Sequence, residues 1–228
     1  MPSFVFMLRG KINLSRILHM EPRPRKKGSY LLTLDDGRII PVHEEVIVKY
    51  KLRSDMEVED GSLQQWILEA DTKMAYDQSL HYLQYRARSR KQMCDYLVRK
   101  GFGKEVIEAA ADKLEGYHFL DDADYAARYI RDKKSGKPMG RRRMTQELKS
   151  KGISEEIAQT AVEGYPEEEE REQALRLGKT CAKRYRDLPA EEFRIKVGRT
   201  LQRRGFDWDT VRHVLRCLQE EEERQDRS

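Results

Sequence analysis

Hydrophobic positions follow two different patterns, which divide the chain near residue 60. Short apolar runs at residues 11–20, 30–34 and 38–42 predict β-strands. Asp36 and Gly37 between the last two runs supply the positive-φ turn of a tight hairpin. Pro41 cannot donate a backbone hydrogen bond, so its strand should lie at a sheet edge. Residues 44–52 fit a short helix or another strand, and their acidic start favours the helix. We therefore expect a small β-rich module over residues 1–60.

From Gly61 onward the apolar residues recur at helical spacing, beginning with Leu63, Trp66 and Ile67. Residues 61–74 are predicted to be a connecting helix. The later prolines lie between periodic segments, where helices are expected to stop, at Pro138, Pro166 and Pro189. The rest of the chain is therefore predicted to be helical.

One motif occurs three times in this helical part. Residues 90–102 (RKQMCDYLVRKGF), 141–153 (RRRMTQELKSKGI) and 194–206 (RIKVGRTLQRRGF) share an arginine start, a leucine and a final basic–Gly–apolar triplet. We expect each glycine to be left-handed and each apolar residue after it to pack back on the leucine, as in a Schellman cap. The predicted structural positions of the repeat are Arg90, Leu97, Gly101, Phe102, Arg141, Leu148, Gly152, Ile153, Arg194, Leu201, Gly205 and Phe206.

Each motif is preceded by another helical stretch and followed by a short helix. Ser154 and Asp207 are candidate N-caps for the short helices, and Asp121 or Asp122 for an earlier one. Tyr125 and Tyr129, four residues apart, are expected in the core, although an exposed edge would also permit base stacking. The prediction is a mainly α fold, with three three-helix repeats in an elongated array after the β-rich module. The predicted boundaries are 1–60, 61–74, 75–120, 121–166, 167–219 and, for an acidic and polar tail, 220–228.

Composition agrees with thin amphipathic helices. Charged residues make up 37% of the chain, hydrophobic residues 38%, and mean hydropathy is −0.86, which disfavours a buried parallel sheet. The three cysteines are far apart in sequence with no CxxC, so we expect no zinc site, disulfide framework or other cofactor. No apolar run approaches the roughly 20 residues that span a bilayer, and the first residues lack signal-peptide features. We expect a cytoplasmic protein with no membrane partner.

Charge is segregated along the chain, although 45 basic residues nearly balance 40 acidic ones. Residues 133–151 contain eight basic residues and one acid, whereas residues 167–170 and 220–223 are acidic runs. Such a basic stripe suits phosphates or an acidic protein surface, and salt should weaken either contact. A solvated helix face is the simpler alternative. We expect Arg141 to lie along the core edge, which leaves Arg142 and Arg143 as candidates for contact.

No spacing in the sequence predicts catalysis. Gly178, Lys179 and Thr180 resemble the end of a phosphate-binding loop, but Gln173 stands where that loop needs glycine. His43 and Glu44 begin a zinc-protease pattern that Ile47 breaks. We therefore expect no enzyme activity, no catalytic residue and no metal ligand.

Three segments resemble the RecX family, the regulators of the RecA recombinase. They are residues 82–102 (YLQYRARSRKQMCDYLVRKGF), 119–153 (FLDDADYAARYIRDKKSGKPMGRRRMTQELKSKGI) and 201–215 (LQRRGFDWDTVRHVL). The resemblance covers roughly residues 75–219, and the β-rich segment resembles the N-terminal extension of the longer members.

The resemblance implies a non-enzymatic modulator of recombination, DNA repair and the SOS response. Such proteins lie in the groove of the RecA filament on single-stranded DNA and inhibit its ATP hydrolysis and strand exchange. We expect a monomer whose partners are the RecA filament and single- or double-stranded DNA. The candidate contact residues are Arg86, Arg88, Lys91, Lys133, Lys134, Lys137, Arg142, Arg143, Lys149, Lys196, Arg199 and Arg203. Two other interpretations remain open: an independent DNA-binding protein that competes for single strands, and a helical scaffold for another protein.

Overall fold

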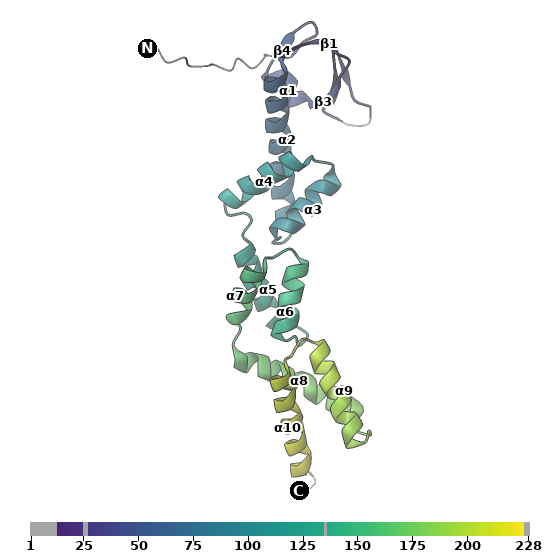
Figure 1. Cartoon of the computed structure of the whole chain (residues 1–228), viewed down its shortest axis with the longest axis vertical. Coiled ribbons are helices and arrows are strands. Elements are labelled where there is room, and N and C mark those ends of the chain that lie inside the picture. Colours follow the sequence, from purple (N-terminus) through teal and green to yellow (C-terminus); the bar gives the residue numbers. More distant parts are fainter. Residues whose placement is uncertain (1–12, 25–26, 135, 226–228) are drawn as a thin grey trace, which may run out of the picture. The chain divides into compact units, whose positions relative to one another are not determined.

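The computed structural model describes residues 13–24, 27–134 and 136–225 (Figure 1). Contacts divide the chain into two compact units. The first lies within residues 1–84 and 96–114, and the second within residues 85–95 and 115–228.

The first unit contains a four-stranded antiparallel sheet. Its strands are β1 (Leu14–Pro22), β2 (Ser29–Leu34), β3 (Ile39–His43) and β4 (Glu57–Glu59), in the order β3-β2-β1-β4. Gly37 has φ 85°, so the predicted hairpin turn is confirmed. Pro41 lies on the edge strand β3, as predicted, opposite Leu31. Strand β4 was not predicted, because three residues are too few to show an alternating pattern.

Two helices complete the core under this sheet. Helix α1 (Glu44–Lys49) confirms the helical interpretation of residues 44–52, and the His43 side chain accepts a 3.3 Å hydrogen bond from the Glu45 amide at its start. Helix α2 (Asp60–Leu83) begins beside the sheet (Figure 1) and buries Leu63 in the sheet core. The Trp66 ring stacks on Tyr50 with 4.1 Å between centroids. The predicted connecting helix is thus the first half of α2, which continues without a break into the residues predicted as the first repeat.

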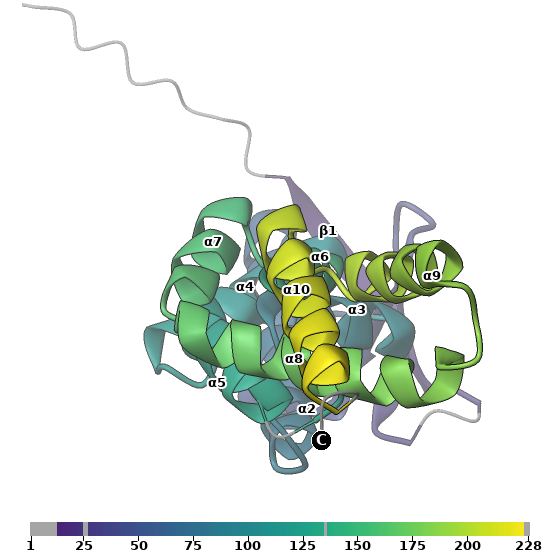
Figure 2. The same cartoon turned by 90° about the horizontal axis from the view of Figure 1, so that it is seen from below.

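The repeats supply the other eight helices of the described residues. They are α3 (Arg90–Lys100), α4 (Lys104–Gly116), α5 (Asp122–Lys134), α6 (Arg141–Ser150), α7 (Glu155–Glu163), α8 (Glu167–Tyr185), α9 (Ala190–Arg203) and α10 (Trp208–Gln225). The second repeat, α5 to α7, closes around Met144 and Leu148. In the third, α10 packs against α8 and α9 (Figure 2) around Val197, Leu201 and Phe206. The three-helix repeats and the mainly α fold are confirmed.

The Schellman caps form as the motif predicts. The three glycines have φ values of 88°, 89° and 87° at Gly101, Gly152 and Gly205. In each cap the amide of the following apolar residue donates to the motif leucine carbonyl: Phe102 to Leu97 at 3.2 Å, Ile153 to Leu148 at 3.2 Å and Phe206 to Leu201 at 3.3 Å. The motif therefore fixes the end of each middle helix by local contacts alone.

Candidate binding surface

The ends of the middle helices meet within the second unit. At the N-terminal end of α6, the Gly140 amide donates to the Arg204 carbonyl at 2.9 Å, and Arg143 Nη1 donates to the Arg203 carbonyl at 3.1 Å. The last carbonyls of a helix have no partner inside it, so these bonds satisfy two at the end of α9. They also place the positive end of the α6 dipole against the negative end of the α9 dipole.

A second junction repeats this arrangement one repeat earlier. Ser89 Oγ, just before α3, donates to the Lys151 carbonyl at the end of α6 at 2.6 Å. The cap glycine is in close contact here, because a Cβ added to Gly152 would fall under 3.0 Å from Lys91 Cβ. A Cβ at Gly205 would meet Arg143 in the same way, whereas one at Gly101 would have nothing within 4 Å. Two of the three glycines therefore have a second role, that of permitting the junction.

Carboxylates from the next repeat accept hydrogen bonds at the same junctions. Glu170 Oε1 on α8 accepts from the Arg141 amide at 2.9 Å, and Asp122 Oδ1 on α5 accepts from the Arg90 amide at 2.8 Å. Both carboxylates therefore satisfy a free amide at a helix start and lie near the positive end of its dipole. The predicted N-cap role on α5 itself belongs to Asp121, whose Oδ1 accepts from two first-turn amides at 2.9 Å.

Arg141 is more than a side chain lying along the core edge. Its Nε lies 3.2 Å from Glu170 Oε2, and its Nη2 donates to the Tyr165 carbonyl. Glu170 is only 3% exposed, and this burial raises the pKa of its carboxyl group, although Arg141 opposes the rise. Arg90 pairs with Glu115 in a similar way. These two arginines link neighbouring elements electrostatically.

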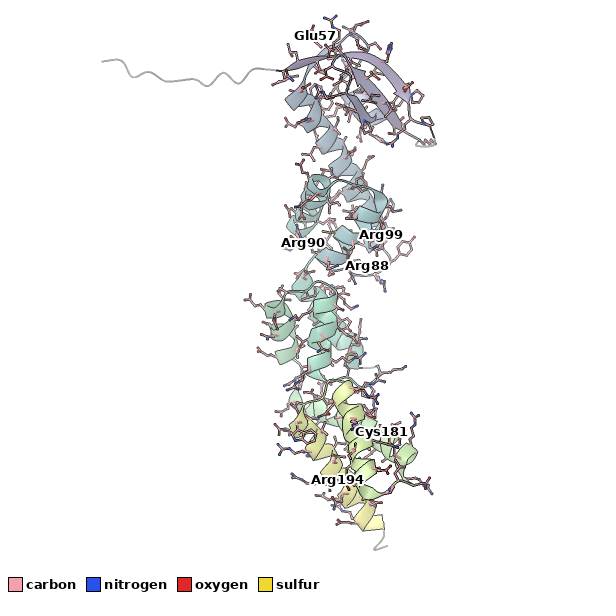
Figure 3. The ribbon with its side chains drawn as sticks, turned by 45° about the vertical axis from the view of Figure 1, so that its right-hand side comes forward. Glu57, Arg88, Arg90, Arg99, Cys181 and Arg194 are labelled. Carbon is pink, nitrogen blue, oxygen red and sulfur yellow. The ribbon has the colours of Figure 1, made fainter. Side chains whose placement is uncertain are left out.

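The third motif arginine does not take this role. Helix α9 begins at Ala190, directly after Pro189, so Arg194 falls in its second turn rather than at its start (Figure 3). Arg194 is exposed and forms no hydrogen bond or ion pair with the described residues. The predicted equivalence of the three arginines is therefore wrong for Arg194, because its helix starts one turn earlier.

Several predicted contact residues already have partners inside the protein. Arg88 is only 9% exposed, so its prediction as a surface contact is wrong. Arg143 lies in the α6–α9 junction and also pairs with Glu147 at 3.2 Å. The other ion pairs are Lys91–Asp95 at 2.8 Å, Lys133–Glu147 at 3.6 Å and Lys149–Glu155 at 2.8 Å. The side chain of Lys134 lies outside the described residues.

Five of the predicted residues remain exposed, with side chains that make no hydrogen bond or ion pair within the described part of the chain. They are Arg86, Lys137, Arg142, Arg199 and Arg203. The charge of Arg142 still acts on a neighbour. Burial tends to raise the pKa of Asp207, but the hydrogen bond from the Thr210 amide and the nearby arginines lower it overall. Lys196 is almost as free, since its contact with Glu192 is 4.0 Å long.

Three of these free cations lie along two adjoining grooves on the second unit. The first, of about 580 Å³, is lined by Tyr185, Lys196, Arg199, Thr200, Gln202 and Arg203. The second, of about 280 Å³, is lined by Arg142, Arg143, Gln146, Gln202, Arg203, Gly205, Phe206 and Trp208. They share Gln202 and Arg203, and no described carboxylate lines either one. We call the two together the α9 groove.

Sequence reasoning found the cations of the α9 groove but missed its aromatic residues. Trp208 is 55% exposed although it stands three residues before the buried Val211, a spacing that favours the core. It is the first residue of α10, ahead of the turns that α8 and α9 cover. Tyr125 and Tyr129 are partly buried against the core of the second repeat, as predicted. All three rings have helical spacing to core residues, and only the packing of the folded protein shows that Trp208 is exposed and the two tyrosines are covered.

Within the described ranges, no three His, Cys, Asp or Glu side chains come together as a metal site. None of the helices in these ranges is long and apolar enough to cross a membrane.

Fold and surface together define a helical repeat protein with a basic groove. Three sequence models of the RecX family match it: the first three-helix domain at residues 75–114, the second at 121–162 and the third at 167–215. A regulatory protein RecX of Levilactobacillus brevis is 32% identical over 203 residues, which cover 89% of this chain and 76% of that protein. The chain belongs to the RecX family, a family of regulatory proteins rather than of enzymes.

Other relatives agree. A regulatory protein RecX of Geobacillus sp. strain WCH70 is 28% identical over 82% of this chain and 69% of its own length. A crystal structure of regulatory protein RecX aligns with a TM-score of 0.66 at 27% identity, covering 88% of this chain and 98% of that one. The crystal structure of RecX from Lactobacillus salivarius gives a TM-score of 0.63 at 26% identity, over 66% and 98% respectively.

Proposed function

We propose that this protein regulates RecA by binding in the groove of the RecA filament on single-stranded DNA, in the cytoplasm, and that it inhibits ATP hydrolysis and strand exchange. The observation that carries this proposal is the α9 groove, a basic surface without carboxylates on a chain of the RecX family. Some other cations of the second unit are neutralised by neighbours, such as Arg128 by Asp124 at 2.7 Å and Arg171 by Glu167 at 2.8 Å.

Unpaired cations are the part of such a surface that can gain most from a polyanion. A paired arginine must give up its carboxylate before it meets a phosphate, whereas Arg142, Arg199 and Arg203 have none to give up. Each phosphate they neutralise releases counterions, so binding should weaken as salt rises. The contact residues we propose are therefore Arg142, Lys196, Arg199 and Arg203, with Arg86 and Lys137 as further candidates.

The hydrogen-bonded junctions give this surface a defined geometry. Helix α6 is held at its start by Glu170 and by the end of α9, so Arg142 and Arg203 are carried on helices that meet directly. Preorganised contacts lose less conformational entropy on binding than flexible ones. A partner with a regular spacing of negative charge, such as a nucleoprotein filament, fits this arrangement.

The test is the ATPase rate of RecA on single-stranded DNA with and without this protein. We expect a fall in rate at stoichiometric amounts, and an unchanged rate would contradict the proposal. The triple variant R142E/R199E/R203E should lose the effect. The matched control is R128E/R171E, which reverses two arginines outside the α9 groove and should keep the inhibition.

The groove also suits a protein that simply competes with RecA for single strands. Order of addition separates the two functions. Inhibition of preformed filaments supports filament binding, whereas inhibition only when this protein meets the DNA first favours competition. If the protein binds neither DNA nor filament, its repeats serve as a scaffold for some other protein.

A further inference from the structure

The α9 groove combines cations with two aromatic side chains at its ends. Tyr185 lines the larger part, and Trp208 lines the smaller part beside Arg142 and Arg203. The Trp208 indole is 55% exposed and has no hydrogen-bond partner among the described residues. Solubility does not explain this large exposed ring, because the neighbouring arginines alone would keep the surface hydrated.

Between the aromatic ends, the cations of α9 form a row. Lys196, Arg199 and Arg203 follow one another at intervals of three and four residues, so they share one face of the helix. At 1.5 Å per residue this row is about 10 Å long. The opposite face carries Val197 and Leu201, both fully buried in the core of the third repeat. The row therefore points away from the core and follows the groove.

A row of cations flanked by aromatic rings matches the chemistry of one class of ligand. Single-stranded nucleic acid offers phosphates to the cations and unpaired bases to the rings, whereas duplex bases are already stacked and unavailable. An acidic protein surface could form ion pairs with Arg199 and Arg203, but it would offer no base to stack on the indole. The aromatic residues thus favour a single strand over an acidic protein.

We propose that the α9 groove binds single-stranded nucleic acid, with the backbone along Lys196, Arg199 and Arg203 and a base stacked on Trp208. Tyr185, at the other end of the row, is packed against the core of the third repeat and has Lys196 Nζ 5.9 Å from its ring centroid, so the base is assigned to Trp208 alone. This inference rests on the proposed function, because it names the ligand of the same surface. It is tested with free strands and no RecA, so a failure to bind strands can be told apart from a failure to regulate RecA.

The test compares a labelled oligothymidylate of about 12 nucleotides, within the usual range of single-strand sites, with an abasic strand of the same length. Trp208→Ala should weaken binding to oligothymidylate about tenfold, the effect of losing one stacked base, and leave abasic binding unchanged. Phe119→Ala is the control, because Phe119 is also an exposed aromatic residue, at 52%, but does not line the groove. An equal loss on both strands, or none on either, would overturn the proposal.

The cation row has its own readout. Arg199→Gln with Arg203→Gln should lower the slope of log affinity against log salt by about 1.4, since each phosphate contact on a single strand contributes about 0.7. The control, Arg128→Gln with Arg171→Gln, should leave that slope unchanged. An unchanged slope in the groove variant would contradict the path along α9. Polyglutamate that binds as tightly as oligothymidylate would overturn the proposal in favour of an acidic protein partner.

Stacking can also be observed directly. The chain has two tryptophans, so Trp66→Phe leaves Trp208 as the only indole while a ring remains stacked on Tyr50. Oligothymidylate should quench the emission of this variant, and the abasic strand should not. Equal emission with and without oligothymidylate at saturation would refute a stacked base at this position.

Discussion

Helices α6 and α9 carry the same motif and end in the same glycine cap, but they start in different surroundings. The start of α6 is covered by Glu170 and by the end of α9. Helix α9 starts after Pro189, with no side-chain cap, and Arg194 in its second turn is exposed. As a result, Arg141 and Arg143 of α6 hold the repeats together, whereas the residues aligned with them in α9, Arg194 and Lys196, are exposed, and Lys196 lines the open groove. Whether other elements cover the helix start decides whether the cations that face those elements are structural or available.

The largest effect that tests this comparison should come from the cap glycines. Gly205→Ala should lower the free energy of unfolding by about 3 kcal/mol, because it adds a close contact with Arg143 to the strain of a positive φ. Gly101→Ala should cost only about 1 kcal/mol, since its φ is the same but its Cβ meets nothing within 4 Å. Urea unfolding measures both, and equal losses would show that the α6–α9 junction adds nothing.

The next largest effect concerns the buried carboxylate of the junction. Glu170→Ala should cost about 2 kcal/mol, because the Arg141 amide loses its acceptor and the guanidinium loses its counter-charge. Glu168→Ala is the matched control: it lies on the same turn, its side chain is 79% exposed, and it should cost under about 0.5 kcal/mol. Thermal unfolding of the two variants under the same conditions makes the comparison.

A smaller effect should separate the adjacent arginines of α6. Arg143→Gln should cost about 1 kcal/mol, since it removes the hydrogen bond to the Arg203 carbonyl and the pair with Glu147. Arg142→Gln should leave stability within about 0.5 kcal/mol and instead weaken binding to single strands. If Arg142→Gln proved the more destabilising of the two, the division of roles between these side chains would be wrong.

The smallest effect is a pH dependence at the same junction. Burial raises the pKa of Glu170 above its ordinary value of 4.5, so the folded protein keeps that proton to higher pH than the unfolded chain does. Stability is therefore lost as the pH rises through the window between the ordinary and the raised pKa. Relative to Glu170→Gln, the wild type should become more stable as the pH falls from 7 to 4. If the difference in free energy of unfolding between the two proteins does not change with pH, Arg141 cancels the effect of burial on the pKa of Glu170.

The sequence contains the signals for nearly all the local structure. The hairpin at Gly37, the caps at Ser154 and Asp207 and the three Schellman caps form as predicted. Each depends on residues within a few positions of one another, so its chemistry can be read along the chain. The short strand β4 and the unbroken course of α2 were missed, because pairing with β1 and packing on the sheet leave little trace in a local pattern.

The candidate surface was predictable only in part. Charge can be read from the sequence, so it predicted Lys196, Arg199 and Arg203. Exposure cannot be read from the sequence, so Trp208 was missed. Arg88 was assigned to the surface in error for the same reason, since it is buried just before α3. Residue type shows which side chains can bind a phosphate, but packing decides which of them reach solvent.

By itself, the sequence determined the three repeats, their capped middle helices and the family to which the chain belongs. Only the tertiary structure decided which helix starts are covered. Those contacts join residues 29 positions apart at Arg141 and Glu170, and 62 apart at Ser89 and Lys151. Capping energies act within one turn of chain, whereas the burial of a charge depends on what the rest of the fold places beside it.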